Sequence, residues 1–151
     1  MSNIILPDGC IDLVVSYDTQ QCGFSGMSKT DFNFEIKLPS RSFGIRLKPG
    51  AFHQLTGLPA KAAMDIFLSL QQLDKSFDEE QFWSSSFEKG KTLFVDYVQQ
   101  LVQDEEAGQF VTFFDDYAET VPDTAAKLLS LLHYSPRQCQ RLFQKHFGLT
   151  P

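Results

Sequence analysis

Six polar side chains near the C-terminus have the types and spacing of a surface that contacts nucleic acid: Arg137, Gln138, Gln140, Arg141, Gln144 and Lys145. An arginine can donate two hydrogen bonds to guanine, and a glutamine can bond both groups on the edge of adenine. Basic side chains also neutralise phosphates. No carboxylate interrupts this segment, whereas an ordinary solvated helix usually carries Glu/Lys pairs. We therefore expect these residues to contact double-stranded DNA.

These side chains share a face only if the segment is a helix, and both of its ends carry helix signals. Ser135 is the expected N-cap, Pro136 fits the first helical position, and Gln138 completes a capping box. Gly148 supplies the left-handed residue that ends a helix. Four apolar residues at helical spacing form the opposite, buried stripe: Cys139, Leu142, Phe143 and Phe147. The spacing predicts a helix over 135–147.

A second helix is expected just before this one. Asp123, after Pro122, is its expected N-cap, and the chain breaks at His133 and Tyr134. Its apolar face is Ala125, Leu128, Leu129 and Leu132. Two helices joined by a short turn have the geometry of a helix-turn-helix. The alternative is a plain amphipathic helix that ends a bundle.

The charge of the chain is uneven. The net charge is -6, but residues 123–151 carry four basic residues and one acidic residue, a charge of +3, which leaves -9 on the rest. A basic end on an acidic body is what a DNA contact confined to one module would produce.

The same C-terminal residues resemble a known family. Tyr134 to Phe143, followed by His146 to Pro151, resembles the first helix-turn-helix of AraC-type transcription regulators, which show Ser-x-Arg-x-Leu-x-Arg-x-Phe and then Phe-Gly-x-Ser-Pro. Cys139 stands where the family prefers Leu, and Thr150 replaces Ser. We expect base contacts from Arg137, Gln140 and Arg141, which project together near the start of the helix. We expect backbone contacts from Gln138, Gln144 and Lys145, and count Ser135 with the DNA-binding residues.

Two N-terminal segments resemble motifs of one class of AraC-type sensor domains: Leu6 to Leu13 and Gly44 to Ala51. The resemblance implies a partial β-barrel with helices, used for sensing or dimerisation, and a bacterial transcription regulator as the whole. Such regulators carry two helix-turn-helix motifs, whereas this chain ends at Pro151, where the helix leading to the second motif would begin. We expect a truncated chain that alone binds DNA weakly.

The predicted fold class is α+β: a small N-terminal sheet or half-barrel, then helices ending in the helix-turn-helix. Apolar alternation predicts strands over 11–17, 22–27, 32–38 and 43–47, with 39–42 as a hairpin connection. Helical spacing predicts helices over 59–73, 78–87, 91–103 and 110–119, with an acidic break at 104–108. The predicted domains are a sensor or dimerisation domain over 1–108 and a partial DNA-binding domain over 109–151.

Other chemistry has weaker support. Asp8, Asp12, Arg46 and His53 could suggest an enzyme, but aspartates four residues apart on a turn and strand more often cap the turn. Cys10, Cys22 and His53 match no metal-binding spacing. We therefore expect no enzyme, no cofactor and no metal.

The alternative function is a small-molecule-binding or protein-interaction module with a structural helical tail. A small effector in the N-terminal domain fits its aromatic content, although aromatics such as Trp83 serve equally as core. Three widely spaced cysteines and no signal peptide favour the cytoplasm, and no apolar run is long enough for a membrane span. A homodimer fits the family resemblance.

Overall fold

The computed structural model describes residues 2–5, 7–35, 39–102 and 122–151, with the side chains of 7–31, 39–101 and 122–151. The chain divides into two compact units, and each is described by itself. The first unit is Met1–Lys48 with Ala63–Asp104, and the second is Pro49–Ala62 with Glu105–Pro151.

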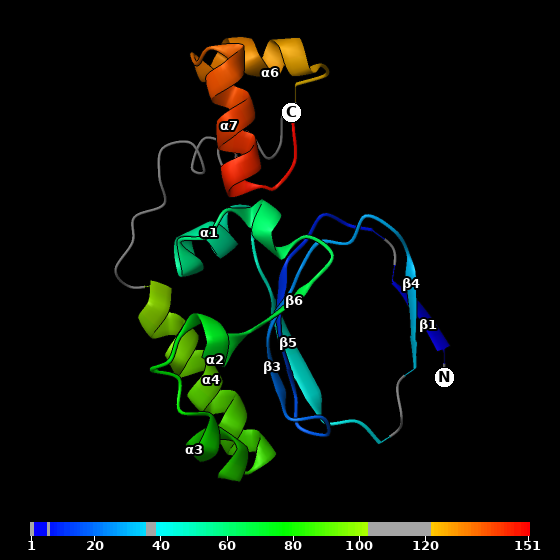
Figure 1. Cartoon of the computed structure of the whole chain (residues 1–151), viewed down its shortest axis with the longest axis vertical. Coiled ribbons are helices and arrows are strands. Elements are labelled where there is room, and N and C mark those ends of the chain that lie inside the picture. Colours follow the sequence, from blue (N-terminus) through cyan, green and yellow to red (C-terminus); the bar gives the residue numbers. More distant parts are fainter. Residues whose placement is uncertain (1, 6, 36–38, 103–121) are drawn as a thin grey trace. The chain divides into compact units, whose positions relative to one another are not determined.

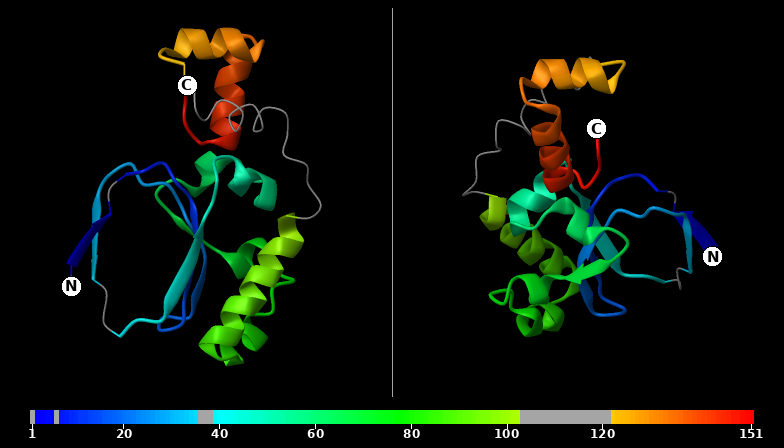
Figure 2. Two further views of the ribbon diagram at one scale, coloured as in Figure 1. Left: turned by 180° about the vertical axis from the view of Figure 1, so that it is seen from behind. Right: turned by 45° about the horizontal axis from the view of Figure 1, so that its top comes forward.

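The first unit is built on antiparallel strands (Figure 1). Four of them form one sheet in the order β5-β2-β3-β6: β5 Ser42–Arg46, β2 Asp12–Ser16, β3 Gln21–Ser25 and β6 Phe67–Ser69. The other two, β1 Ser2–Ile5 and β4 Phe32–Glu35, pair with each other. Figures 1 and 2 place the helices of this unit on one side of the four-stranded sheet and the β1–β4 pair on the other.

The core of the first unit lies between the four-stranded sheet and its helices. Leu13 and Val15 alternate along β2 and are fully buried, as the period-2 pattern predicts. Phe82 and Phe94 of the helices are also buried, and Tyr17 meets Trp83 edge to face with ring centroids 5.3 Å apart. Aromatic rings prefer such edge contacts. In this arrangement the aromatics of the unit, Trp83 included, pack on one another.

The helices of the first unit are α2 Leu70–Leu73, α3 Glu79–Ser84 and α4 Phe87–Val102. Helices α3 and α4 lie within the segments where periodicity predicts them, except that α4 begins four residues earlier. The predicted helix over 59–73 is wrong. The segment instead contains a 3-10 turn, η1 Ala60–Ala63, then strand β6 and then α2. Asp65 adopts a left-handed φ of 58°, which a helix does not allow, and the chain then pairs with β3.

The strands follow the sequence prediction more closely than their connections do. Strands β2, β3, β4 and β5 all fall within or next to the predicted segments. The predicted hairpin at 39–42 is wrong, because β4 pairs with β1 whereas β5 pairs with β2. Hydrogen bonding to different partners therefore separates two strands that are adjacent in sequence.

The second unit contains α1 Ala51–Thr56, α6 Ala125–Leu132 and α7 Pro136–His146. Helix α7 packs against both α6 and α1. The predicted N-cap of α6 is wrong by one residue: Thr124 accepts from the backbone N–H of Lys127, and Asp123 forms an ion pair with the Lys127 ammonium group at 2.8 Å. No sequence pattern predicted a helix at the position of α1.

The α+β class is confirmed, with an open four-stranded antiparallel sheet followed by helices. Three predictions lie outside the described residues: the break at 104–108, the helix over 110–119 and the domain boundary after residue 108. Residues 49–62 belong to the same compact unit as the C-terminal helices, although the sequence places them with the N-terminal domain.

Candidate nucleic-acid interface

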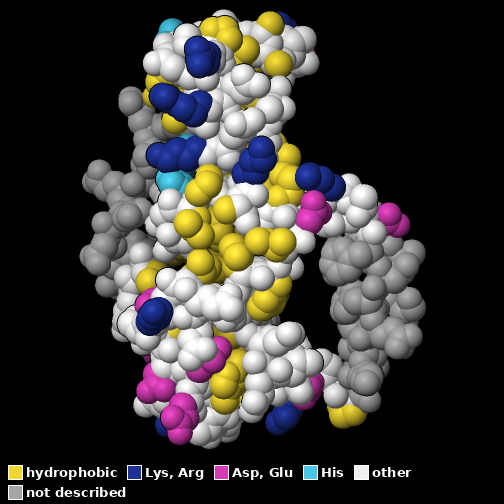
Figure 3. Space-filling model, viewed as in Figure 1, with side chains coloured by type: hydrophobic (Ala, Val, Ile, Leu, Met, Phe, Trp, Pro, Cys, Tyr) yellow, Lys and Arg dark blue, Asp and Glu magenta, His cyan; other side chains and the backbone are white. Residues whose placement is uncertain are grey.

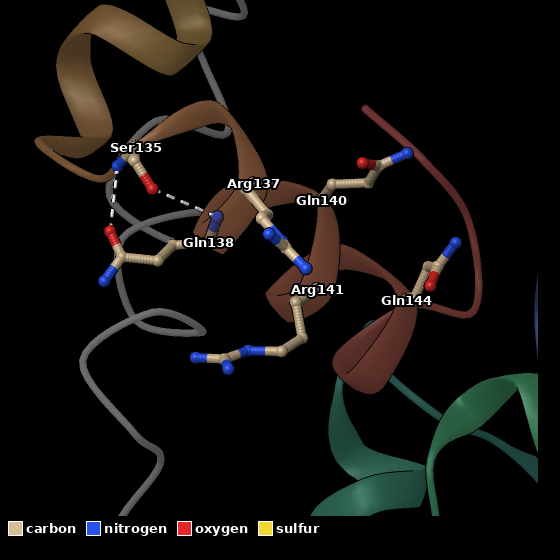
Figure 4. Close-up of a pocket in the computed structure, with 6 residues that line it drawn as sticks. All are labelled: Ser135, Arg137, Gln138, Gln140, Arg141 and Gln144. Carbon is tan, nitrogen blue, oxygen red and sulfur yellow. Dashed lines mark hydrogen bonds between the residues drawn. The ribbon is translucent and has the colours of Figure 1, made fainter.

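Helix α7 begins at the predicted capping box. The backbone N–H of Gln138 donates to the Ser135 hydroxyl at 3.3 Å, and the backbone N–H of Ser135 donates to the Gln138 amide oxygen at 3.0 Å (Figure 4). Pro136 occupies the first turn, where its missing N–H has no cost. Gly148 follows the helix with a left-handed φ of 74°. These caps fix both ends of α7 from its own sequence.

The buried stripe of α7 holds it against α6. Cys139, Phe143 and Leu132 form a buried cluster, with Leu128, Leu129, Leu142 and Phe147 packed around it. All four residues predicted for the buried face of α7 are in this cluster. Between the helices, His133 adopts a left-handed φ of 55°, which turns the chain sharply. Buried contacts and a tight turn together hold the two helices as one unit.

Most of the polar face of α7 is exposed to solvent, and Gln144 is half-buried. Figure 4 shows the side chains of this face. Six of the seven predicted DNA-binding residues line a hollow of about 650 Å³: Ser135, Arg137, Gln138, Gln140, Arg141 and Gln144. The seventh, Lys145, is exposed on the same helix but does not line the hollow. In Figure 4 the side chains of Gln138 and Arg141 extend to one side of Arg137, and those of Gln140 and Gln144 extend to the other. The structure thus brings the predicted residues together on one face.

The two arginines of this face lack acidic partners. Within the part of the chain that the structure describes, no hydrogen bond or ion pair engages the side chain of Arg137 or Arg141. Figure 3 shows Lys and Arg side chains over α6 and α7 with no Asp or Glu among them on the visible face. Among the described residues, their donors are therefore not engaged.

The two arginines of the first unit are held by aspartates instead. Arg46 contacts Asp12 at 3.0 Å and Asp8 at 2.9 Å. Arg41 donates to Asp18 through its backbone N–H at 2.7 Å and through its guanidinium at 3.4 Å. These bonds, the backbone one first, hold the pKa of Asp18 below its usual value.

The residues that could suggest an enzyme have structural partners. Asp8 accepts from the backbone N–H of Cys10 at 3.0 Å, as a turn-capping aspartate does, and Asp12 is bonded to Arg46. His53 belongs to the other unit. Among the described residues, no three His, Cys, Asp or Glu side chains form a cluster that could hold a metal ion.

Sequence reasoning missed two features of the surface and packing. In the second unit, His53 of α1 meets His146 of α7 edge to face, with ring centroids 4.9 Å apart. In the first unit, a hollow of about 620 Å³ includes the exposed side chains of Ile66 and Phe67. Gly50, which follows the predicted strand over 43–47, is the N-cap of α1. The contact partners themselves leave no local signal in the sequence.

Residues 2–69 match a family described as a domain of unknown function (DUF6597). The matched segment begins with the first residue of β1 and ends with the last residue of β6, so it includes every strand described. No curated protein and no solved structure matches the chain. No helix among the described residues is long and apolar enough to cross a membrane.

Proposed function

We propose that the chain is part of a DNA-binding transcription regulator and that α7 is its recognition helix. The observation that carries this proposal is the pair of arginines on the exposed face of α7 that have no partner among the described residues, in a chain whose other two arginines are bonded to aspartates. Unpaired guanidinium groups on one rigid helix face suit acceptors on guanine and on phosphate. The resemblance to AraC-type regulators supports the same function.

The packing of α7 supports the proposed function in addition to its charge. Base contacts must be held in place by elements whose own packing is fixed. Helix α7 meets this requirement through its capping box, its buried Cys139 and Phe143, and its packing against α6 and α1. A helix that only closes a bundle also has a polar outer face, but that face usually carries Glu/Lys pairs, whereas α7 contains no carboxylate.

The proposal is tested by fluorescence anisotropy with duplex DNA at low salt. Replacing Arg137 or Arg141 by alanine should weaken binding about tenfold each, because each change removes charged hydrogen bonds to DNA. The matched control is Lys89→Ala, which removes the same charge from an exposed position on α4 and should leave affinity within about twofold. Equal losses in all three variants, or none, would exclude α7 as the recognition helix.

A second candidate function rests on the hollow beside Ile66 and Phe67. These exposed side chains lie together with Ser28, Lys29 and Asp65, and the Lys29 ammonium group is paired with Asp65 at 3.6 Å. Such a mixture suits a small effector with an apolar body and a polar group that hydrogen-bonds. Binding of a metabolite here should raise the melting temperature, and Phe67→Ser should abolish that rise. A screen that raises the melting temperature equally in wild type and variant would place the ligand elsewhere.

A further inference from the structure

We infer that the DNA sequence bound by α7 contains two guanines one to two base pairs apart, with an adenine beyond the second. This inference rests on the proposed function. Three features of α7 support it. These are the polar residues at the centre of the exposed face, their separation along the helix, and the hydrogen-bonding groups that are already engaged within the protein.

The centre of the exposed face is defined by the buried stripe behind it. At about 100° per residue, the direction opposite Cys139, Leu142, Phe143 and Phe147 falls between Arg137 and Arg141. Gln144 and Gln138 lie about 60° from that direction on opposite sides, Lys145 lies between Arg141 and Gln138, and Gln140 lies farther out. A helix in the major groove directs its central residues to the base edges and its flanks to the groove walls. Arg137 and Arg141 therefore face the bases, and Gln144, Lys145 and Gln138 flank them.

The rise of the helix sets the spacing of the bases. Arg137 and Arg141 are separated by four residues, about 6 Å along the axis, and Gln144 lies about 4.5 Å further. Because a helix in the major groove lies obliquely to the DNA axis, residues three or four positions apart contact bases one to two base pairs apart. Arginine pairs with the two acceptors of guanine, and glutamine pairs with the acceptor and donor of adenine.

Gln138 differs from Gln144 in what its side chain can still donate or accept. Its amide oxygen already accepts from the backbone N–H of Ser135, which leaves only the NH₂ group for DNA. An NH₂ group alone can donate to a phosphate but cannot pair with both groups of adenine. In the part of the chain that the structure describes, the Gln144 side chain has no such bond. Of the two glutamines that flank the arginines at similar angles, only Gln144 thus has a complete amide.

The test is selection of duplexes with a randomised centre by the 151-residue chain at about 50 mM salt, where phosphate contacts are strong. Sequencing of the bound fraction should show the two guanines at the stated spacing and the adenine beyond. Arg137→Lys and Arg141→Lys keep the charge but lose the fork, so each should lower preference at one guanine by about tenfold. Gln144→Ala should remove the preference for adenine, and Gln138→Ala should not.

The outcomes separate this inference from the function on which it rests. Duplexes enriched without the paired guanines, or an unchanged preference in both lysine variants, would overturn the base assignment while DNA binding stands. If no duplex is enriched and anisotropy detects no binding, the proposed function fails as well. Circular dichroism of each variant shows that α7 is still folded, and the lysine variants retain the charge of the face.

Discussion

Arginine has two different roles in this chain. In the first unit, Arg46 joins the turn before β2 to the strand itself through Asp8 and Asp12, so its charge is neutralised within the fold. On α7, Arg137 and Arg141 have no such partner among the described residues. An exposed ion pair contributes little to stability, so its main effect is on the charge presented to solvent. The sequence revealed the residue types on α7, but only the structure shows which arginines are neutralised.

The three cysteines should differ sharply in reactivity. Burial raises the pKa of the Cys22 thiol to about 12 and also raises the pKa values of Cys139 and Cys10, for Cys10 together with the nearby Asp8. The side chains of Cys22 and Cys139 are buried, whereas Cys10 is partly exposed. Because the thiolate is the reactive form, an alkylating reagent at pH 8 should modify Cys10 well before the other two. Mass spectrometry of digested protein measures the order, and labelling in denaturant, where all three react, is the control. Early labelling of Cys139 would show that α6 and α7 separate.

Among the helices and strands, the correct predictions are those whose sequence signals lie in neighbouring residues. The caps of α7 and the alternation of β2 need only residues that are close in sequence, and both predictions are confirmed. The segment 59–73 has apolar residues at helical spacing, yet Ile66 is 48% exposed and β6 pairs with β3. Pairing with a distant strand overrides local preference there. The packing of α1 against α7 also joins residues that are far apart in the sequence, so no local pattern predicted it.

The contact between α1 and α7 should weaken in acid. Burial, with smaller contributions from His53 and Lys145, lowers the pKa of His146 below 6.5. The unfolded chain therefore binds more protons than the folded one just below pH 6.5, so stability is full above that pH and falls as the pH drops through it. Thermal melting between pH 8 and pH 5 should show this loss.

Two variants isolate His146 as the source of that pH dependence. His146→Phe keeps a ring against His53 but cannot titrate, so it should flatten the dependence of melting temperature on pH. His133→Asn removes an exposed histidine and suits the left-handed φ at that position, so it should leave the dependence unchanged. If His146→Phe melts with the slope of the wild type, other groups cause the loss.

For the whole molecule, the uneven charge has a direct consequence for DNA binding. The net charge of -6 combines +3 on residues 123–151 with -9 elsewhere. The acidic remainder repels DNA over distances that depend on salt. Binding should therefore be weak and sensitive to ionic strength.

The contribution of one phosphate contact can be measured through that sensitivity. Lys145 lies beside the central residues of α7 and carries a point charge suited to phosphate. Lys145→Gln should weaken binding to all sequences alike and reduce the slope of log affinity against log salt by about 1. Lys89→Gln on α4 should leave the slope as it is. A change in sequence preference in the Lys145 variant would instead indicate a base contact.

Because the chain passes between the two units more than once, the helix-turn-helix and its packing partner α1 cannot be transferred to another protein as one continuous segment. The chain leaves the first unit after Lys48, supplies α1 to the second, and returns at Ala63. The structural partner of α7 is thus encoded between two strands of the sheet, β5 and β6. A graft of residues 105–151 onto another protein would leave α1 behind and expose the side of α7 that it covers. A transplantable version of this helix-turn-helix has to carry 49–62 as well, as a separate insertion or a redesigned cover.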